Sequence, residues 1–254
     1  MKALEPQARA LLAPLKNLAT RGVRLRVADL RALSSRAGWF RVAIGAVKEK
    51  AGRETLYTPL MEGVLSLGGR GVKPWVECRI FARPAAQDGT TLDARKLRLE
   101  QTLIEALAQI VPPGGHLMVD YESPGQEQTF EELNAGIPPP ASHLGALMLQ
   151  AGFRGDFKDW YFSEGGHEGP RKLQGNKPPD AAAEARALKR HRAALAAFVA
   201  MPAPAASAQA AVFLRARRRA RALLHRLAAP RRQTRWAAPA RPARPQGQRH
   251  RPRP

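Results

Sequence analysis

Hydrophobic positions along the first 80 residues change period several times, and each change predicts a new element. Leucines within residues 2–20 recur at the spacing of an amphipathic helix. Apolar and basic residues then alternate over Val23–Val27, and Trp39–Ile44 is a second strand-like run. The runs Leu56–Leu67 and Trp75–Ala82 are separated by glycines and a proline, which predicts two strands joined by a longer turn.

Helix and strand patterns alternate along the next part of the chain. Thr90 and Asp93 have the spacing of a capping box, which predicts a helix over Leu92–Ile110. Two prolines and two glycines end this helix, and His116–Tyr121 has the pattern of a short strand. The polar stretch that follows is expected to be a loop.

The last elements of the pattern are a capped helix, a strand and an alanine-rich helix. Ser142 is expected to begin the first of these and Gly152 to end it. Phe157–Phe162 predicts a strand, residues 163–180 a long loop, and residues 181–200 the last helix. Strands first, followed by alternating elements, indicate an α+β or mixed α/β sheet.

The composition changes abruptly after Met201. Residues 202–254 contain 14 Arg and no Lys, Asp or Glu, so they carry +14 of the formal net charge of +21 and leave +7 for residues 1–201. We therefore expect one globular domain at residues 1–201 and an Arg-, Pro- and Ala-rich tail at residues 202–254. The tail is expected to be disordered because it buries too little apolar surface to offset chain entropy, although Ala208–Leu227 has the pattern of one helix.

This tail leaves three interpretations open. Arginine neutralises phosphate whatever the base sequence, so a nucleic-acid partner is expected to bind through the tail alone. Val212, Phe213 and Leu214 stand beside arginines, which equally suits a helix lying on an anionic membrane. The third interpretation is an appended or out-of-frame C-terminal segment.

Cysteine content and hydropathy narrow the class of protein. The single Cys78 excludes an intramolecular disulfide framework and a cysteine-cluster zinc site, and its apolar neighbours predict a buried strand position. No stretch reaches the roughly 18 uninterrupted apolar residues of a membrane span, and the N-terminus has no secretory apolar core. We therefore expect a cytoplasmic protein without a transmembrane segment.

Three stretches resemble a known family: GHLMVDYE at residues 115–122, AGIPPPASHLGALMLQAGF at 135–153 and FKDWYFSEGGHEGPRKLQGNKP at 157–178. They are similar to the domain of unknown function 1122 family, which is grouped with the acyl-CoA N-acyltransferase (GNAT-like) superfamily. The resemblance implies a mixed, mainly antiparallel sheet flanked by helices. It also implies acetyl-CoA or another acyl-CoA as cofactor, with an amine on a small molecule or protein as acceptor.

The chain departs from that superfamily where the cofactor phosphates are expected. Active acetyltransferases carry a Q/R-x-x-G-x-G/A loop between a central strand and its helix, whereas Pro84–Asp93 here contains a single glycine. Backbone N–H groups at a helix start bind phosphate, so the resemblance assigns cofactor binding to Gly89, Thr90 and Thr91. Asp88 and Asp93 would oppose a diphosphate at the same place.

Two residues are candidates for proton transfer. Asp120 and Glu122 share one face at the end of a predicted strand, and Glu122 is placed to deprotonate an acceptor amine. The resemblance implies that Tyr161 protonates the leaving thiolate. The competing interpretations are two solvated acids at a strand end and a tyrosine that packs in the core.

The segment Glu164–Lys177 is the most unusual in the chain. Its four glycines allow close approach to a ligand, and its cations suit a phosphate or carboxylate. We expect substrate contacts from Trp160, Glu164, Arg171, Lys172 and Lys177. No metal site is predicted, because the histidine spacing of a metal-binding helix is absent. The alternative for this segment is a flexible connector. The alternative for the whole protein is a non-catalytic ligand- or nucleic-acid-binding protein on the same fold.

Overall fold

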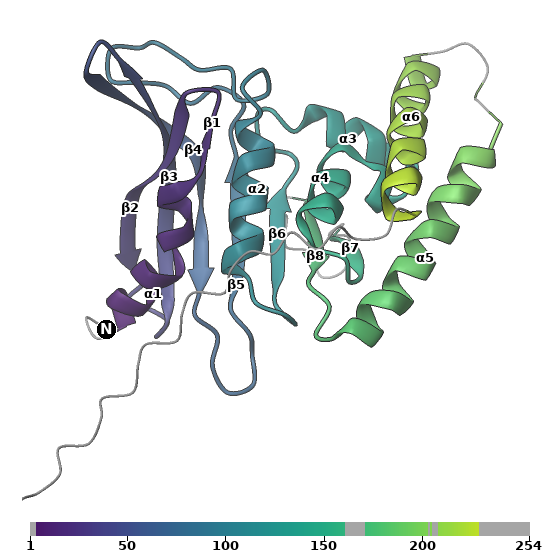
Figure 1. Ribbon diagram of the computed structural model, residues 1–254, viewed down its shortest axis with the longest axis horizontal. Helices are drawn as coiled ribbons and strands as arrows, with labels where there is room; N and C mark the ends of the chain where they lie inside the picture. Colours follow the sequence, from purple (N-terminus) through teal and green to yellow (C-terminus); the bar gives the residue numbers. More distant parts are fainter. Residues whose placement is uncertain (1–3, 161–170, 203, 205–207, 229–254) are drawn as a thin grey trace, which may run out of the picture.

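The protein is built around one open, mainly antiparallel sheet with helices packed against it, as the computed structural model shows (Figure 1). The structure describes residues 4–160, 171–202, 204 and 208–228. Within these residues the eight strands lie in the order β1-β2-β3-β4-β5-β6-β8-β7. The expected α+β class with a mainly antiparallel sheet is confirmed. The strands are β1 (Ala19–Thr20), β2 (Val23–Ala32), β3 (Trp39–Lys50), β4 (Arg53–Ser66), β5 (Trp75–Ile80), β6 (His116–Asp120), β7 (Phe157–Trp160) and β8 (Lys172–Asn176).

Six α-helices and two 3₁₀ turns accompany these strands in the described part of the chain. The helices are α1 (Glu5–Leu11), α2 (Leu99–Ile110), α3 (Glu127–Asn134), α4 (His143–Ala151), α5 (Ala181–Ala200) and α6 (Ala208–Ala228), and the 3₁₀ turns are η2 (Ala13–Asn17) and η3 (Pro139–Ala141). None of the described helices is both apolar enough and long enough to cross a bilayer.

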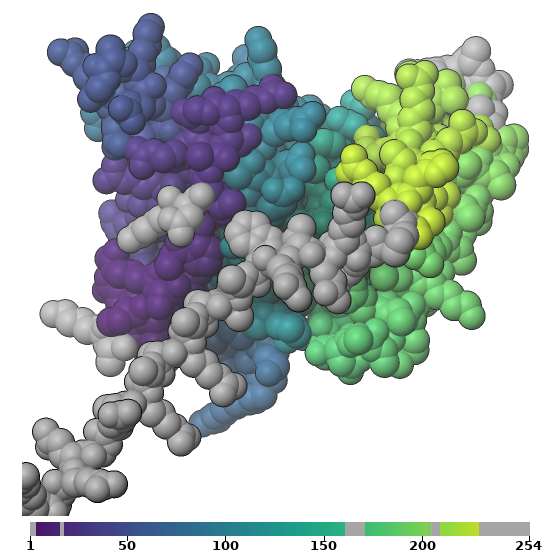
Figure 2. Space-filling view, in the orientation of Figure 1, coloured from purple at the N-terminus to yellow at the C-terminus, as the bar shows by residue number. Residues whose placement is uncertain are grey.

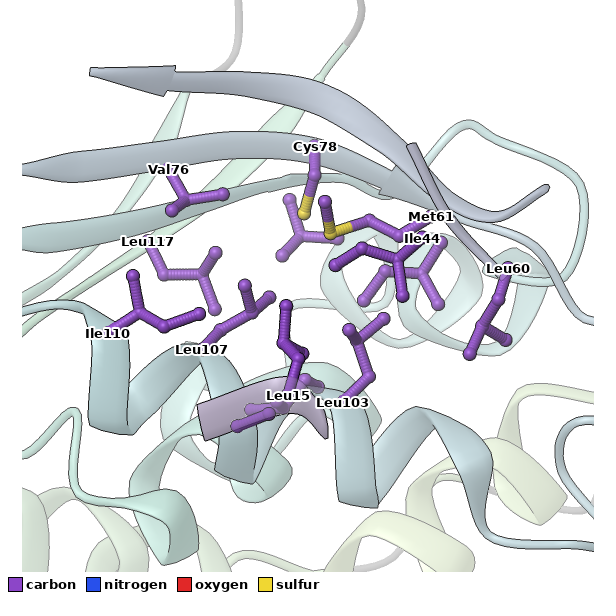
Figure 3. Close-up of a cluster of buried hydrophobic side chains, with 14 of the residues drawn as sticks. Leu15, Ile44, Leu60, Met61, Val76, Cys78, Leu103, Leu107, Ile110 and Leu117 are labelled. Carbon is purple, nitrogen blue, oxygen red and sulfur yellow. The ribbon is translucent and has the colours of Figure 1, made fainter. Parts of the chain in front are cut away.

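The main core lies between α2 and the central strands. Leu103 and Leu107 of α2 point toward Val76 and Cys78 of β5 and Leu117 of β6 (Figure 3), and all five side chains are buried. Side chains alternate along β5 and β6, so Val76, Cys78 and Leu117 lie on the face of the sheet that meets α2, and charged residues lie on the other face. Cys78 is therefore a buried strand residue, as expected.

The β5–α2–β6 unit is the only parallel connection among the described strands. Val76 pairs with Leu117 and Arg79 with Asp120, so the carboxyl ends of β5 and β6 lie side by side. All other strand pairs in the sheet are antiparallel. This unit places one strand edge where a ligand can approach two carboxyl ends at once.

The predicted start of α2 is wrong. The helix begins at Leu99, after Arg98 in a left-handed conformation, and not beside Thr90. The N–H and hydroxyl of Thr90 both donate to Asp88 Oδ1, and Asp93 Oδ1 accepts from the Lys96 N–H. The side chains of the supposed capping box therefore stabilise two local turns, which compete with a helix start.

Two elements arise where the sequence pattern predicts loops. Helix α3 has a polar surface and buries only Thr129 and Glu132, so it lacks a recognisable apolar stripe. Strand β8 alternates Lys172, Leu173 and Gln174 but carries a glycine, which weakens its strand pattern. The predicted helix at residues 143–151 is confirmed, and so is its Ser142 cap, whose Oγ accepts from the Gly145 N–H.

Helices α5 and α6 lie side by side at the edge of the molecule opposite β1 and β2 (Figure 1). The ring centroids of Phe198 on α5 and Phe213 on α6 are 4.9 Å apart. Both side chains belong to a second buried cluster with Leu195 and Leu223. The expectation of a disordered tail is therefore wrong for residues 208–228, because one apolar stripe of α6 is buried. Residues 229–254 lie outside the described part of the chain.

Candidate functional site

Strands β5 and β6 part after the pair Arg79–Asp120. Beyond this pair each strand keeps only its other neighbour: the Phe81 N–H donates to Leu60 O, and the Tyr121 N–H donates to Arg171 O. Two parallel strands that separate at their carboxyl ends leave space between those ends, into which the following loops fold. We call this place the strand split.

A cavity of about 450 Å³ lies at the strand split. This volume falls within the range of about 300–1,000 Å³ typical of small-molecule sites. The cavity is lined by the segment after β5, the turns before α2, the loop after β6 and the start of α3: Phe81, Ala82, Arg83, Asp93, Arg95, Pro124, Gly125 and Glu127. We call it the split cavity, and it is the candidate ligand site.

Glycine at position 125 is required by the shape of the split. Its φ is +100°, and a Cβ there would lie 2.5 Å from the Cβ of Ala82. The chain therefore crosses from β6 toward β5 at van der Waals distance, and Arg95 donates to the Gly125 carbonyl from the opposite side. Glu127 accepts from the Gly125 N–H at 2.8 Å, so both backbone groups of this glycine are fixed.

The rim of the split cavity carries charges of both signs. Arg83 is exposed and has no ion pair among the described residues, whereas Asp93 and Glu127 face the same cavity. Hydrogen bonds from backbone N–H groups, first that of Gly125, lower the pKa of Glu127. Its carboxylate therefore stays ionised at neutral pH.

A buried polar cluster stands behind the split. Glu100, at the start of α2, accepts from Gln126 Nε2 at 2.6 Å and from His143 Nε2 at 2.8 Å. Burial raises the pKa of Glu100, but the hydrogen bond and charge of His143 and the bond from Gln126 outweigh it, so the pKa is lowered overall. The cluster fixes α2 against the loop after β6 and against α4.

A second hollow, of about 270 Å³, lies on the face of the sheet opposite α2. Ion pairs cross its floor: Arg79 Nε is 2.9 Å from Asp120 Oδ2, and Lys172 Nζ is 2.5 Å from Glu77 Oε1. Glu62 also lines this hollow. The Asp120 side chain is only 5% exposed, so its pairing with Arg79 holds a buried carboxylate at the end of β6.

Of the two residues expected to transfer protons, the structure describes only Glu122. Its Oε2 accepts from the Arg171 N–H at 3.2 Å, and its Oε1 lies 3.4 Å from Arg171 Nε. The pair links the end of β6 to the start of β8. Tyr161 and Glu164 lie outside the described residues.

Arg171 contacts Glu122, and Lys172 pairs with Asp120 on the neighbouring strand, but Trp160 lies one strand further away and Lys177 lies at the other end of β8. Trp160 pairs with Lys172 across β7 and β8 and donates from Nε1 to Gln174. Lys177 follows the far end of β8. Counted along the strand from Lys172, it is about 17 Å away at about 3.3 Å per residue. There its ammonium donates to Ala108 O, and burial lowers its pKa.

The three residues expected to bind the cofactor do not line the split cavity. Gly89, Thr90 and Thr91 lie in the exposed turn after Ala86. Within Pro84–Asp93 only the last residue, Asp93, lines the cavity, and Arg83 lines it from just before this segment. No group of metal-binding side chains occurs within the residues that the structure describes.

Sequence reasoning missed the residues that form the split. Arg83 and Arg95 stand on either side of the segment expected to bind the cofactor. Two cations flanking that segment were the available sequence signal for a phosphate site. Glu100 and His143 are 43 residues apart in the chain, and no local pattern connects them.

Comparisons with known proteins give a family and a fold. A family model described as a protein of unknown function (DUF1122) matches residues 36–201. A crystal structure of a protein of unknown function, AQ1966 from Aquifex aeolicus VF5, is similar with a TM-score of 0.59 and 23% identity, covering 86% of this chain and 98% of that one. No curated protein matches the chain.

The extent of the structural match bears on α6. Residues 1–201 are 201 of 254, or about 79% of the chain, which is less than the 86% covered. The shared fold therefore continues past residue 201, into the part of the chain that contains α6.

Proposed function

We propose that this chain, which belongs to the DUF1122 family of proteins of unknown function, binds an acyl-CoA-type thioester at the strand split and transfers its acyl group to an amine. The observation that carries the proposal is the parting of two parallel strands directly beside the split cavity. Ligands of open α/β sheets collect at the carboxyl ends of strands. The strand order and the β5–α2–β6 crossover support a GNAT-like fold.

In this proposal the cofactor phosphates lie against Arg83 and Arg95. Guanidinium groups bind phosphate through paired hydrogen bonds, and both arginines face the split cavity. The turn with Gly89, Thr90 and Thr91 fits phosphate poorly, because the Thr90 N–H and hydroxyl already donate to the Asp88 carboxylate. The two arginines thus take the place of the missing glycine-rich loop.

The chemistry of the proposed transfer is a displacement at the thioester carbonyl. The acceptor nitrogen attacks the carbonyl carbon, a C–N bond forms, and the C–S bond breaks. Glu122 takes the proton that the amine loses, and Tyr161 gives a proton to the leaving thiolate. Glu62, which lines the charged hollow together with Lys172, would attract the cationic amine before it is deprotonated. Trp160, Glu164 and Arg171 are proposed as further substrate contacts.

One observation favours a second candidate function, a non-catalytic ligand-binding protein on the same fold. Glu122 already accepts from the Arg171 backbone and pairs with its side chain. A carboxylate held in this way must exchange a partner before it accepts a proton. The two candidates differ in whether thiol is released.

The test is thiol release from acetyl-CoA with a panel of small amines, using wild type, Glu122→Gln and Glu49→Gln. Glu49 is exposed at the end of β3, away from the split, so its variant controls for the change in charge. We expect Glu122→Gln to lose about 100-fold or more in turnover with unchanged CoA binding, and Glu49→Gln to match wild type. CoA binding without thiol release would favour the second candidate.

A further inference from the structure

Helices α5 and α6 pack against each other at one side of the molecule (Figure 2), and the sequence of this pair is strongly basic. Their sequences contain ten Lys and Arg, four on α5 and six on α6, against one carboxylate, Glu184. Glu184 is already bonded to Arg154 at 2.9 Å. The helix pair therefore carries a formal excess of nine positive charges that its own acidic residue does not neutralise.

The charge on α6 is concentrated on the face that points away from the protein. Phe213, Ala216, Ala220 and Leu223 form the buried face. Residues 215, 218, 221 and 226 occupy the exposed face, and all are arginines. We call these four residues the α6 arginine face.

Few carboxylates reach this face. Arg215 is 3.7 Å from Glu131, but both side chains are 55% exposed, so the pair contributes little. Arg226 donates to Gln150, a neutral partner. Arg218 and Arg221 have no ion pair within the described part of the chain, and like charges three residues apart destabilise a helix. An external polyanion would relieve this repulsion.

The burial of the apolar stripe decides between two kinds of polyanion. A helix that binds a membrane surface needs its apolar face free to enter the lipid. Here Phe213 is 7% exposed and packs on Phe198, so that face is already used inside the protein. A nucleic-acid backbone needs only the exposed arginines.

The neighbours of the arginines indicate what kind of nucleic-acid contact they make. Leu214, Ala211, Ala222 and His225 are also exposed on α6, but no Phe, Tyr or Trp is exposed there for a base to stack on. Arg215 and Arg226 are eleven residues apart, a rise of about 16 Å, or about five base pairs. This geometry suits phosphates along a duplex and provides no means of reading the bases.

We propose that the α6 arginine face binds the phosphate backbone of duplex nucleic acid independently of base sequence. The binding surface belongs to a packed helix of the fold and is separate from the split cavity. It does not depend on the proposed acyl transfer, since none of its residues lines that cavity.

The test compares two full-length variants with the same loss of charge. One carries Arg215→Gln, Arg218→Gln and Arg221→Gln on α6, and the control carries Arg241→Gln, Arg244→Gln and Arg249→Gln near the C-terminus. Binding to a labelled DNA duplex of about 30 base pairs, to its RNA counterpart and to a scrambled duplex is measured from about 0.05 to 0.2 M salt. Thermal unfolding confirms that both variants are folded.

We expect the α6 variant to bind every duplex at least about tenfold more weakly, with a salt slope lower by about 2 to 3, while the control keeps most of the wild-type affinity. A larger loss in the control than in the α6 variant would overturn the proposal. So would wild-type protein that binds no duplex, or that binds only vesicles of phosphatidylcholine and phosphatidylserine.

Discussion

Cys78 is protected by its position in β5. It is 3% exposed, and burial raises its pKa, as do the charges of Glu77 and Asp120. Because the thiolate is the reactive form, the native protein is expected to resist thiol reagents.

Labelling of Cys78 therefore reports unfolding. We expect iodoacetamide to modify it slowly in buffer and quickly in denaturant, with a rate that follows the unfolded fraction. Mass spectrometry of the intact chain measures the extent, since the chain has a single cysteine. Rapid, stoichiometric labelling of the folded protein would contradict the burial of this strand.

His191 makes the packing of α5 sensitive to acid. Burial lowers its pKa below the ordinary value of 6.5, and Nε2 donates to Gly155 O at 2.7 Å. The unfolded chain therefore binds a proton more readily than the folded one, so stability falls as pH drops through about 6.5. We expect the melting temperature to decline between about pH 7 and pH 5.

The matched variants are His191→Gln and His225→Gln. His225 is exposed on α6, so its substitution should leave the pH profile of the melting temperature unchanged. His191→Gln should flatten the decline, since glutamine keeps a donor for Gly155 O and does not ionise. Equal slopes in the two variants would show that His191 does not cause the acid sensitivity.

At the level of elements, Glu132 of α3 joins three helices. Its carboxylate is fully buried and accepts from both terminal nitrogens of Arg219 on α6, at 2.8 and 2.9 Å. It also accepts from the His143 N–H at the start of α4. Arg219 is therefore the main polar link between α6 and the rest of the fold.

Removal of Arg219 should uncouple this link. We expect Arg219→Ala to cost about 3 kcal/mol, because it leaves a buried carboxylate without its cation. For a domain of this size that lowers the melting temperature by roughly 6–12 °C. Arg218→Ala, one position away on the exposed face, should shift it by no more than about 1 °C. Equal, small shifts would mean that α6 is not docked through Glu132.

The elements that were predictable have local signals. Ser142 and Gly152 bound α4 because a cap and a left-handed glycine act within four residues. The packing of α6 was not predictable, since its apolar stripe is sparse and its partner Glu132 is 87 residues away. The start of α2 was missed because Asp93 stabilises a turn with the same residues that suit a helix cap.

At the scale of the whole molecule, the sheet places the split cavity and the charged hollow at the same strand ends. The hollow lies beside the Arg79–Asp120 pair, and the split cavity begins just beyond it, at Phe81. The sequence identified the end of β6 as a functional candidate, through Glu122, because strand ends are locally visible. It could not show that Arg83, Arg95 and Gly125 line one cavity, since this depends on how β5 and β6 pair.

The most direct test of the account is a thermal-shift titration of the full chain with CoA and acetyl-CoA, using wild type, Arg83→Glu and Arg53→Glu. Arg53 is exposed in the β3–β4 hairpin, away from the split cavity, and its variant has the same change of charge. At 100 times the dissociation constant, binding should stabilise the wild type by about 2.7 kcal/mol, or roughly 5–10 °C. We expect a saturable shift for wild type and Arg53→Glu that is lost in Arg83→Glu. No shift in wild type at millimolar ligand, or an equal shift in both variants, would contradict the assignment of the split cavity.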